Sequence, residues 1–209
     1  KLKEVERFKN KVDYEYLKQE ISGLLKGIDD GARRTAEIVS GLKNFSRLDE
    51  SDIKEANVNE GIESTLILVR NAVPNNTEIV TELGDLPFIE CYPGKLNQVF
   101  MNILTNAIYA VKHKPEDTQN RITITSKKMG DKIHVIFHDT GIGMTKEVKE
   151  KIFEPFFTTK DVGEGTGLGM SIVYKIIESH HAKLEVESEL GVGTTLTLIL
   201  NQRINPKNS

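Results

Sequence analysis

A glycine-rich turn that leads directly into an apolar helical stretch constrains this chain more than any other feature. Residues 163–169 read GEGTGLG and residues 170–174 read MSIVY. Glycine-rich backbone at the start of a helix presents free N–H groups and the positive end of the helix dipole, and both attract a phosphate. No Lys-Ser/Thr pair follows, as it would in a P-loop, and no strand at the chain start precedes the turn, as a dinucleotide fold requires. The pattern predicts a phosphate site of another kind.

A strongly helical stretch over residues 96–112 contains two asparagines on one face. Asn102 and Asn106 are four residues apart, so both amides project in the same direction. Asparagine favours caps and turns over helix interiors, and its amide oxygen is a neutral, hard ligand that suits Mg²⁺ beside waters and phosphates. The pair predicts a magnesium site, with an exposed polar face as the alternative.

A second glycine turn follows an apolar strand and begins with a carboxylate. Residues 139–143 read DTGIG. A carboxylate at the end of a strand can accept the exocyclic amino group of adenine, whereas guanine would set an oxygen against it, so the site would select ATP over GTP. The glycines let the backbone approach a base closely. The alternative is a plain turn.

Three phenylalanines stand between the two glycine turns, in an irregular segment. Phe153, Phe156 and Phe157 either fill the core or form the hinge of a lid over the nucleotide. Lys160 follows Thr158 and Thr159, where it can reach the phosphates.

The other patterns predict an α+β fold, a two-layer α/β sandwich with helices on one face of a mixed sheet. A long helix with an apolar seam between residues 21 and 45 precedes it, and this seam predicts a partner: a second copy, a missing neighbouring helix, or the C-terminal domain itself. We expect domains at residues 1–50 and 51–209. The predicted later elements are a helix capped by Asn57 or Asn59 and running to Ala72, strands at 77–83, 121–129 and 132–138, a helix at 166–179, and a hairpin of 183–189 with 194–200.

Composition excludes several classes of protein. The net charge of −3 gives no electrostatic case for nucleic-acid binding. One cysteine, Cys91, excludes an intramolecular disulfide and fits a reducing compartment, so we expect a cytoplasmic location. No apolar run approaches the roughly 20 residues that span a bilayer, so no membrane contact is expected from this chain, whereas membrane anchoring of the full-length protein stays open. The chain begins at Lys1 without Met, and we expect a fragment of a longer protein.

Four segments together resemble the motifs of sensor histidine kinases, in the same order and spacing. Residues 102–107 resemble the N box, 139–143 the G1 box, 153–160 the F box and 163–169 the G2 box. The resemblance covers about residues 57–200. It implies the Bergerat-type ATP-binding sandwich shared with gyrase, Hsp90 and MutL, with a mobile lid between the F and G2 boxes.

The resemblance also implies roles for particular residues. Asn106 would hold Mg²⁺ with help from Asn102, and Asp139 would read adenine. Asn102 and Lys160 would take part in catalysis. Tyr109 stands where the family often has a Lys or Arg, which puts a phosphate contact from that position in question. The full set implied for ATP is Asn102, Asn106, Tyr109, Ala110, Asp139, Gly141, Ile142, Gly143, Met144, Phe157, Thr158, Lys160, Gly165, Thr166, Gly167, Leu168, Gly169 and Thr195.

The reaction type follows from one comparison within that superfamily. Gyrase-like ATPases carry a Glu where Asn102 stands, and an amide cannot act as a general base. The site therefore favours transfer to a separate nucleophile over hydrolysis, by positioning and charge neutralisation. The resemblance implies transfer of the γ-phosphoryl group of Mg-ATP to a histidine, with ADP as product, and relay to an aspartate on the receiver domain of a response regulator.

The accepting histidine is expected outside this chain. Residues 31–47 resemble the second helix of the family's dimerisation hairpin, through which the whole protein would form a homodimer, and the first helix with the acceptor is absent. No histidine precedes His113. We expect structural or surface roles for the five histidines, with His180 and His181 at a helix C-terminus that favours a cation.

Three alternatives stay open at this point. The fold could be a nucleotide-dependent conformational module without transfer, or the helical seam could make the chain a scaffold. A protein-serine kinase of the mitochondrial or anti-sigma type shares the pocket, although such relatives often carry Glu at the position of Asn102.

Overall fold

The computed structural model describes residues 16, 18–28, 31, 32, 35, 52–115, 118–161 and 165–204. The chain divides into two units, Lys1–Ser40 and Gly41–Ser209, where the sequence predicted a boundary at residue 50. In the first unit residues 18–28 are helical and expose Ile21, Leu24, Leu25 and Ile28. The rest of the predicted seam, over residues 38–45, lies outside the described residues.

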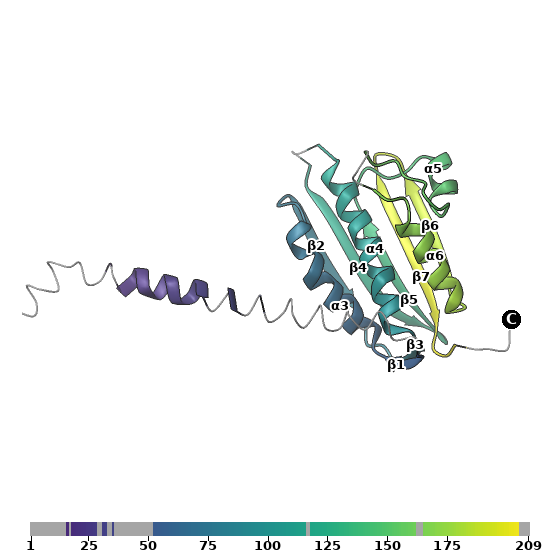
Figure 1. Ribbon diagram of the computed structural model, residues 1–209, viewed down its shortest axis with the longest axis horizontal. Helices are drawn as coiled ribbons and strands as arrows, with labels where there is room; N and C mark the ends of the chain where they lie inside the picture. The colour runs from purple at the N-terminus through teal and green to yellow at the C-terminus, as the bar shows by residue number, and fades with distance from the viewer. Residues whose placement is uncertain are drawn as a thin grey trace, which may run out of the picture. The chain divides into compact units, whose positions relative to one another are not determined.

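The second unit contains a five-stranded mixed sheet, shown in Figure 1. Its strands lie in the order β2, β4, β5, β7, β6, and only β2 and β4 are parallel neighbours. This confirms the α+β prediction. The strands are β2 (Thr77–Leu83), β4 (Asn120–Met129), β5 (Lys132–Asp139), β6 (Lys183–Glu189) and β7 (Gly193–Asn201).

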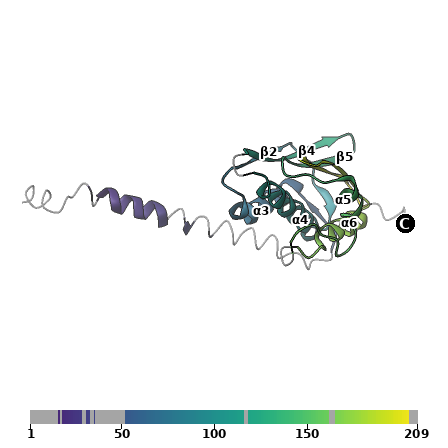
Figure 2. The same cartoon turned by 90° about the horizontal axis from the view of Figure 1, so that it is seen from above.

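Three helices cover one face of this sheet, as the view from above shows (Figure 2). They are α3 (Val58–Val69), followed by the 3₁₀ turn η2 (Arg70–Ala72), α4 (Pro93–Lys112) and α6 (Gly169–Ser179). Helix α4 is central, because it contacts α3, α6 and the strands β4, β5 and β7. Its fully buried residues include Val99, Phe100, Ile103, Leu104 and Val111, and together with apolar side chains from β4, β5 and β7 they form the core.

Helix boundaries follow local chemistry. Asn57 caps α3 by accepting a hydrogen bond from the N–H of Asn59, as predicted. Helix α4 begins at Pro93, three residues before the predicted start, because proline suits the first turn of a helix. Helix α6 begins at Gly169 and not at residue 166, since the preceding turn has Gly167 at a φ of +66°.

Three short elements were not predicted. Strands β1 (Lys54–Ala56) and β3 (Ile89–Cys91) pair with each other in a separate two-stranded sheet, and α5 (Lys146–Lys151) follows the second glycine turn. No side chain of α5 is buried, so the segment has no apolar periodicity to reveal it. In the described part of the chain, no helix is long and apolar enough to cross a membrane.

Candidate nucleotide site

A cavity of about 410 Å³ lies beside the second half of α4. Asn102 and Asn106 line it, and so do the glycine turn after β5, the segment after Phe157, and the start of α6. Every residue that the sequence assigned to the site lines this cavity, apart from Gly141, Leu168 and Thr195. Residues that lie far apart in the chain are therefore brought together around one space.

The carboxylate of Asp139 points into this cavity because of the alternation along β5. Ile133, Val135 and Phe137 face the helices and are buried, and Asp139 continues the same face with 5% of its surface exposed. One oxygen of Asp139 accepts a hydrogen bond from the N–H of Gly141, at 2.8 Å. Burial raises the pKa of the Asp139 carboxyl to about 6, although this hydrogen bond and a second one from the backbone of Thr194 act in the opposite direction. The cavity thus contains a buried carboxylate with acceptor capacity to spare.

The two asparagines of α4 have different contacts. The amide nitrogen of Asn102 donates to the carbonyl oxygen of Gly169 at 3.2 Å, which ties α4 to the first residue of α6. The amide oxygen of Asn106 accepts from the ammonium group of Lys160 at 3.0 Å. The first contact fixes the helix N-terminus that would face phosphate, and the second sets a cation against an oxygen of the predicted metal site.

Two glycines are required by close backbone approach. Gly143 has a φ of +64°, and a side chain there would collide with the carbonyl oxygen of Glu189. Gly167 has a φ of +66°, and a side chain there would collide with the backbone of Phe156. The N–H of Phe156 donates to the carbonyl oxygen of Gly167 at 2.9 Å, so the two ends of the segment 157–166 are held together.

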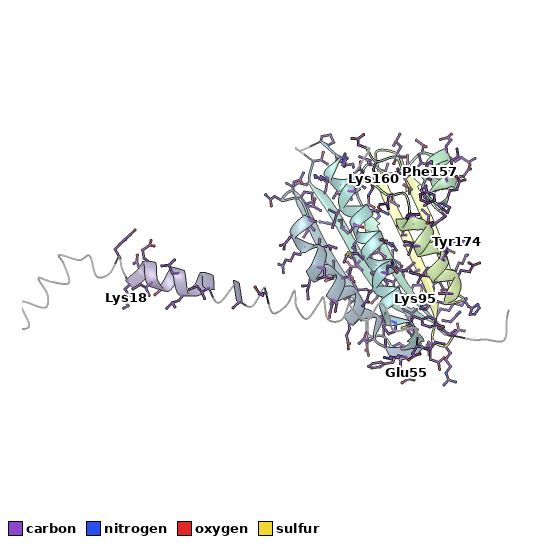
Figure 3. The ribbon with its side chains drawn as sticks, viewed as in Figure 1. Lys18, Glu55, Lys95, Phe157, Lys160 and Tyr174 are labelled. Atoms are coloured by element: carbon purple, nitrogen blue, oxygen red, sulfur yellow. The ribbon has the colours of Figure 1, made fainter. Side chains whose placement is uncertain are left out.

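The three phenylalanines do not fill the core. Phe153 lies against the ring of Tyr174, with 5.5 Å between centroids, and Phe157 lines the cavity. Phe156 is 75% exposed and has a φ of +67°, which is rare for a bulky residue. Figure 3 labels Phe157, Lys160 and Tyr174, with Phe157 and Lys160 at the same end of the sheet as α5.

Three of the predicted site residues do not line the cavity. Thr195 faces away from the cavity, because the inward positions of β7 are Thr194 and Leu196, and its hydroxyl lies 2.9 Å from Nδ1 of His138. Gly141 uses its N–H on Asp139, and Leu168 uses its N–H on the hydroxyl of Thr166. The alternation of Leu196, Leu198 and Leu200 indicates in the sequence which face of β7 is buried, and Thr194 belongs to that face whereas Thr195 does not. Lining residues that the sequence analysis missed are Thr105, Ala107, Val148, Ile152, Thr159, Met170, Thr194 and Leu196.

His180 has the expected structural role, but as a neutral ring and not as the cation that a helix C-terminus favours. His180 is 4% exposed, its Nε2 accepts the N–H of Tyr92 at 3.1 Å, and its Nδ1 lies 2.7 Å from the carbonyl oxygen of Ile176. Both contacts are satisfied only by a neutral ring that donates from Nδ1. Burial lowers the pKa of His180, so the buried ring overrides the preference of the helix terminus for a cation.

The donor set fits a hard cation held mainly by the nucleotide. Among the described residues no group of three or more His, Cys, Asp or Glu side chains could hold a metal ion. The amides of Asn102 and Asn106 are what Mg²⁺ takes beside phosphates and water. Cys91 is buried and its pKa is raised to about 12 by burial, which leaves the thiol protonated.

Residues 91–204 match the family described as "Histidine kinase-, DNA gyrase B-, and HSP90-like ATPase". The chain belongs to this family. Sporulation kinase E of Bacillus subtilis (strain 168) is 40% identical over 157 residues, which are 73% of this chain and 20% of that protein. The signal transduction histidine-protein kinase AtoS of Escherichia coli (strain K12) is 35% identical over 192 residues, 90% of this chain and 29% of that protein.

Solved structures agree with this assignment. The nucleotide-free catalytic domain of histidine kinase ThkA is 33% identical and superposes with a TM-score of 0.61, covering 73% of this chain and 97% of that domain. The resemblance to sensor histidine kinases is thereby confirmed, and the second unit contains the ATP-binding catalytic domain of such a kinase. The chain spans less than a third of the length of each of these two kinases.

Proposed function

We propose that this kinase domain binds Mg-ATP in the cavity beside α4 and transfers the γ-phosphoryl group to a histidine outside the chain, with ADP as product. The observation that carries the proposal is the buried carboxylate of Asp139, which has free acceptor capacity at one end of a cavity whose other end has the asparagines. A buried acceptor of this kind favours adenine, which offers an amino group where guanine offers an oxygen.

The contacts along α4 support one orientation of the nucleotide in the cavity. The carbonyl oxygen of Ala110 accepts the N–H of Ile142, so the loop that follows Asp139 lies at the end of α4. Asn102 contacts Gly169 at the start of α6, eight residues earlier. Eight helical residues rise roughly 12 Å, which suits an extended nucleotide with its base near Ala110 and its phosphates near Asn102. Gly165, Thr166 and Gly167 would contact the phosphates from the opposite side.

Asn106 would hold Mg²⁺, with Asn102 assisting. In support, the amide oxygen of Asn106 already accepts a hydrogen bond from a cationic group, the Lys160 ammonium. When bound, the ion would neutralise charge on the phosphates and bring them into line for transfer. The protein's own part is to hold the amides, the lysine and the N-terminus of α6 in fixed positions.

Transfer fits the cavity better than hydrolysis does. Among the described lining residues Asp139 is the one carboxylate, and it belongs to the end that would receive the base. Asn102 cannot take a proton from water at neutral pH, because a neutral amide is not a general base. The attacking group would therefore be a nucleophile from another segment: a histidine in a full-length protein that forms a dimer and relays the phosphoryl group to a receiver domain.

Calorimetry would test the binding half of this proposal. The chain is titrated with a non-hydrolysable ATP analogue and the matching GTP analogue, with and without Mg²⁺. We expect Mg²⁺-dependent binding with the ATP analogue at least about tenfold tighter. Asp139→Asn should abolish the selectivity, whereas Asp131→Asn, an exposed residue in the turn between β4 and β5, should not change it. Equal affinity for the two analogues in the wild type would contradict the assignment of Asp139.

The transfer half needs an acceptor in trans. A helical peptide or domain with an acceptor histidine is incubated with the chain and γ-labelled ATP, and label on histidine is recognised by its loss in acid and retention in base. We expect label only with an active chain, and none with Asn106→Ala. Release of phosphate without any labelled histidine, with a competent acceptor, would favour a hydrolase.

A further inference from the structure

The ammonium group of Lys160 is held by two groups of α4. It donates to the amide oxygen of Asn106 at 3.0 Å and lies 4.2 Å from the centroid of the Tyr109 ring. Asn106 and Tyr109 are three residues apart, so they are neighbours on one helix surface. Lys160 comes from the segment that follows α5, far from α4 in the sequence. The lysine is half-buried, and all three residues line the cavity.

The Tyr109 ring is itself held in place from behind. The imidazole of His113 stacks on it, with 3.9 Å between centroids and an interplanar angle of 30°. Nδ1 of His113 lies 2.9 Å from the carbonyl oxygen of Tyr109, which fixes the imidazole on that helical turn. A stacked ring at 3.9 Å leaves no room for a cation on the same face, so the ammonium lies on the opposite face. The Tyr109 ring therefore lies between the His113 imidazole and the Lys160 ammonium group, and the ammonium group also donates to Asn106.

We propose that Tyr109 is a positioning residue: its ring holds the Lys160 ammonium at Asn106 before nucleotide arrives, at the place where the phosphates and their cation will stand. The proposal rests on the proposed function, because it needs phosphates at the Asn106 end of the cavity. Asn106 would also hold the cation, so the Lys160 ammonium would move from the amide oxygen of Asn106 to a phosphate oxygen when nucleotide binds. The ring restricts the rotamers of the Lys160 side chain before nucleotide binds, which reduces the side-chain entropy lost on nucleotide binding.

A second lysine lies over a tyrosine ring at the start of α4, away from the cavity. Lys95 lies over the ring of Tyr92 at 4.3 Å, nearly the same separation, but neither residue lines the cavity. In Figure 3 Lys95 lies near the end of the sheet remote from Lys160. Lys160 differs in having both the amide oxygen of a predicted metal ligand and an open cavity beside it. The Lys95 pair is therefore the matched control.

The test combines a double-mutant cycle with a spectroscopic measurement. Affinity for a Mg²⁺-loaded, non-hydrolysable ATP analogue is measured by calorimetry for the wild type, Tyr109→Leu, Tyr109→Phe, Lys160→Met and Tyr109→Leu combined with Lys160→Met. We expect Tyr109→Leu to weaken binding about three- to tenfold, and Tyr109→Phe clearly less, since the face of the ring is kept. In the Lys160→Met background, the change at Tyr109 should alter affinity by less than about twofold. Lys95→Met should have no effect.

The spectroscopic measurement tests whether Lys160 lies over the Tyr109 ring in the absence of nucleotide. Protons on the last carbons of Lys160 should show an upfield ring-current shift in the NMR spectrum of the nucleotide-free chain, kept in Tyr109→Phe and lost in Tyr109→Leu. Equal losses from Tyr109→Leu with and without Lys160 would overturn the proposal, since the ring would then act on its own. An unshifted Lys160 would also overturn it. If the wild type binds no nucleotide but the Lys160 protons show the upfield shift, the proposed function is wrong, whereas the contact between Lys160 and the Tyr109 ring is confirmed.

Discussion

A buried ionisable side chain and a lysine over a tyrosine ring occur near both ends of the helical layer, but only at one end do they lie beside the cavity. At one end Asp139 is a buried ionisable group that still has acceptor capacity, and Lys160 lies over Tyr109 beside a cavity. At the other end His180 is buried with both ring nitrogens satisfied, and Lys95 lies over Tyr92, where neither residue lines the cavity beside α4. We infer that a buried ionisable group or a cation over an aromatic ring indicates a functional site only where hydrogen-bonding capacity remains unused beside a cavity.

The largest expected effect concerns two glycines with the same φ of +64°, one at each end of β5. Gly143, at the cavity, has no room for a side chain because of the Glu189 carbonyl, whereas Gly130 has no atom within 4 Å of an added Cβ. Gly130→Ala should cost about 1 kcal/mol from backbone strain alone. Gly143→Ala should cost about 3 kcal/mol, since the collision adds to the strain. Urea unfolding of both variants measures the difference, and similar losses would show that the cavity end is not tightly packed there.

The next effect separates function from stability at Asp139. A carboxyl whose pKa is raised stabilises the fold when protonated, so its contribution is present below pH 3.8 and is lost as pH rises through about 6. At pH 8 the ionised group should cost about 3 kcal/mol, from 1.4 kcal/mol per pKa unit. Asp139→Asn should therefore raise the free energy of unfolding at pH 8 while destroying nucleotide selectivity. A variant that is less stable than the wild type at pH 8, yet folded, would show that the carboxylate is well compensated.

His180 should show the opposite pH dependence. Its pKa is lowered by burial, so its contribution is present above the unfolded value near 6.5 and is lost as pH falls below it. His180→Leu should cost about 1–3 kcal/mol at pH 8, because the N–H of Tyr92 loses its acceptor. The variant should also lose part of the acid-side slope of stability against pH, measured by thermal melts from pH 5 to 8. His181→Leu is the control, and an unchanged slope in His180→Leu would place the acid sensitivity elsewhere.

The smallest effect belongs to a region at neither end. Arg121 and Glu78 form an ion pair at 2.9 Å across β4 and β2, with both side chains well exposed. Such pairs contribute less than about 1 kcal/mol and are screened by salt. Arg121→Ala should change the free energy of unfolding by less than about 0.5 kcal/mol and leave nucleotide affinity unchanged. A larger change at high salt would mean that the arginine stem packs on the sheet.

Elements with a strong internal pattern were predicted from the sequence. Strand β2 has the predicted bounds, Thr77–Leu83, and β6 has the predicted bounds, Lys183–Glu189. Strands β1 and β3 were missed because each has only three residues and depends on pairing with another part of the chain. Helix α5 was missed because its stability comes from the Thr145 cap and not from burial. A hydrophobic period can be recognised within one segment of the sequence, whereas strand pairing depends on two segments.

The sequence by itself determined the motifs around the cavity, because each depends on local chemistry: amides one helical turn apart, a carboxylate after an apolar strand, and glycines where the backbone turns. Only the tertiary structure decided which atoms meet. It turned Thr195 away from the cavity and Thr194 toward it, made His180 neutral, and set Lys160 on Asn106 and Tyr109. These outcomes depend on burial and on contacts between distant segments, which no local pattern specifies.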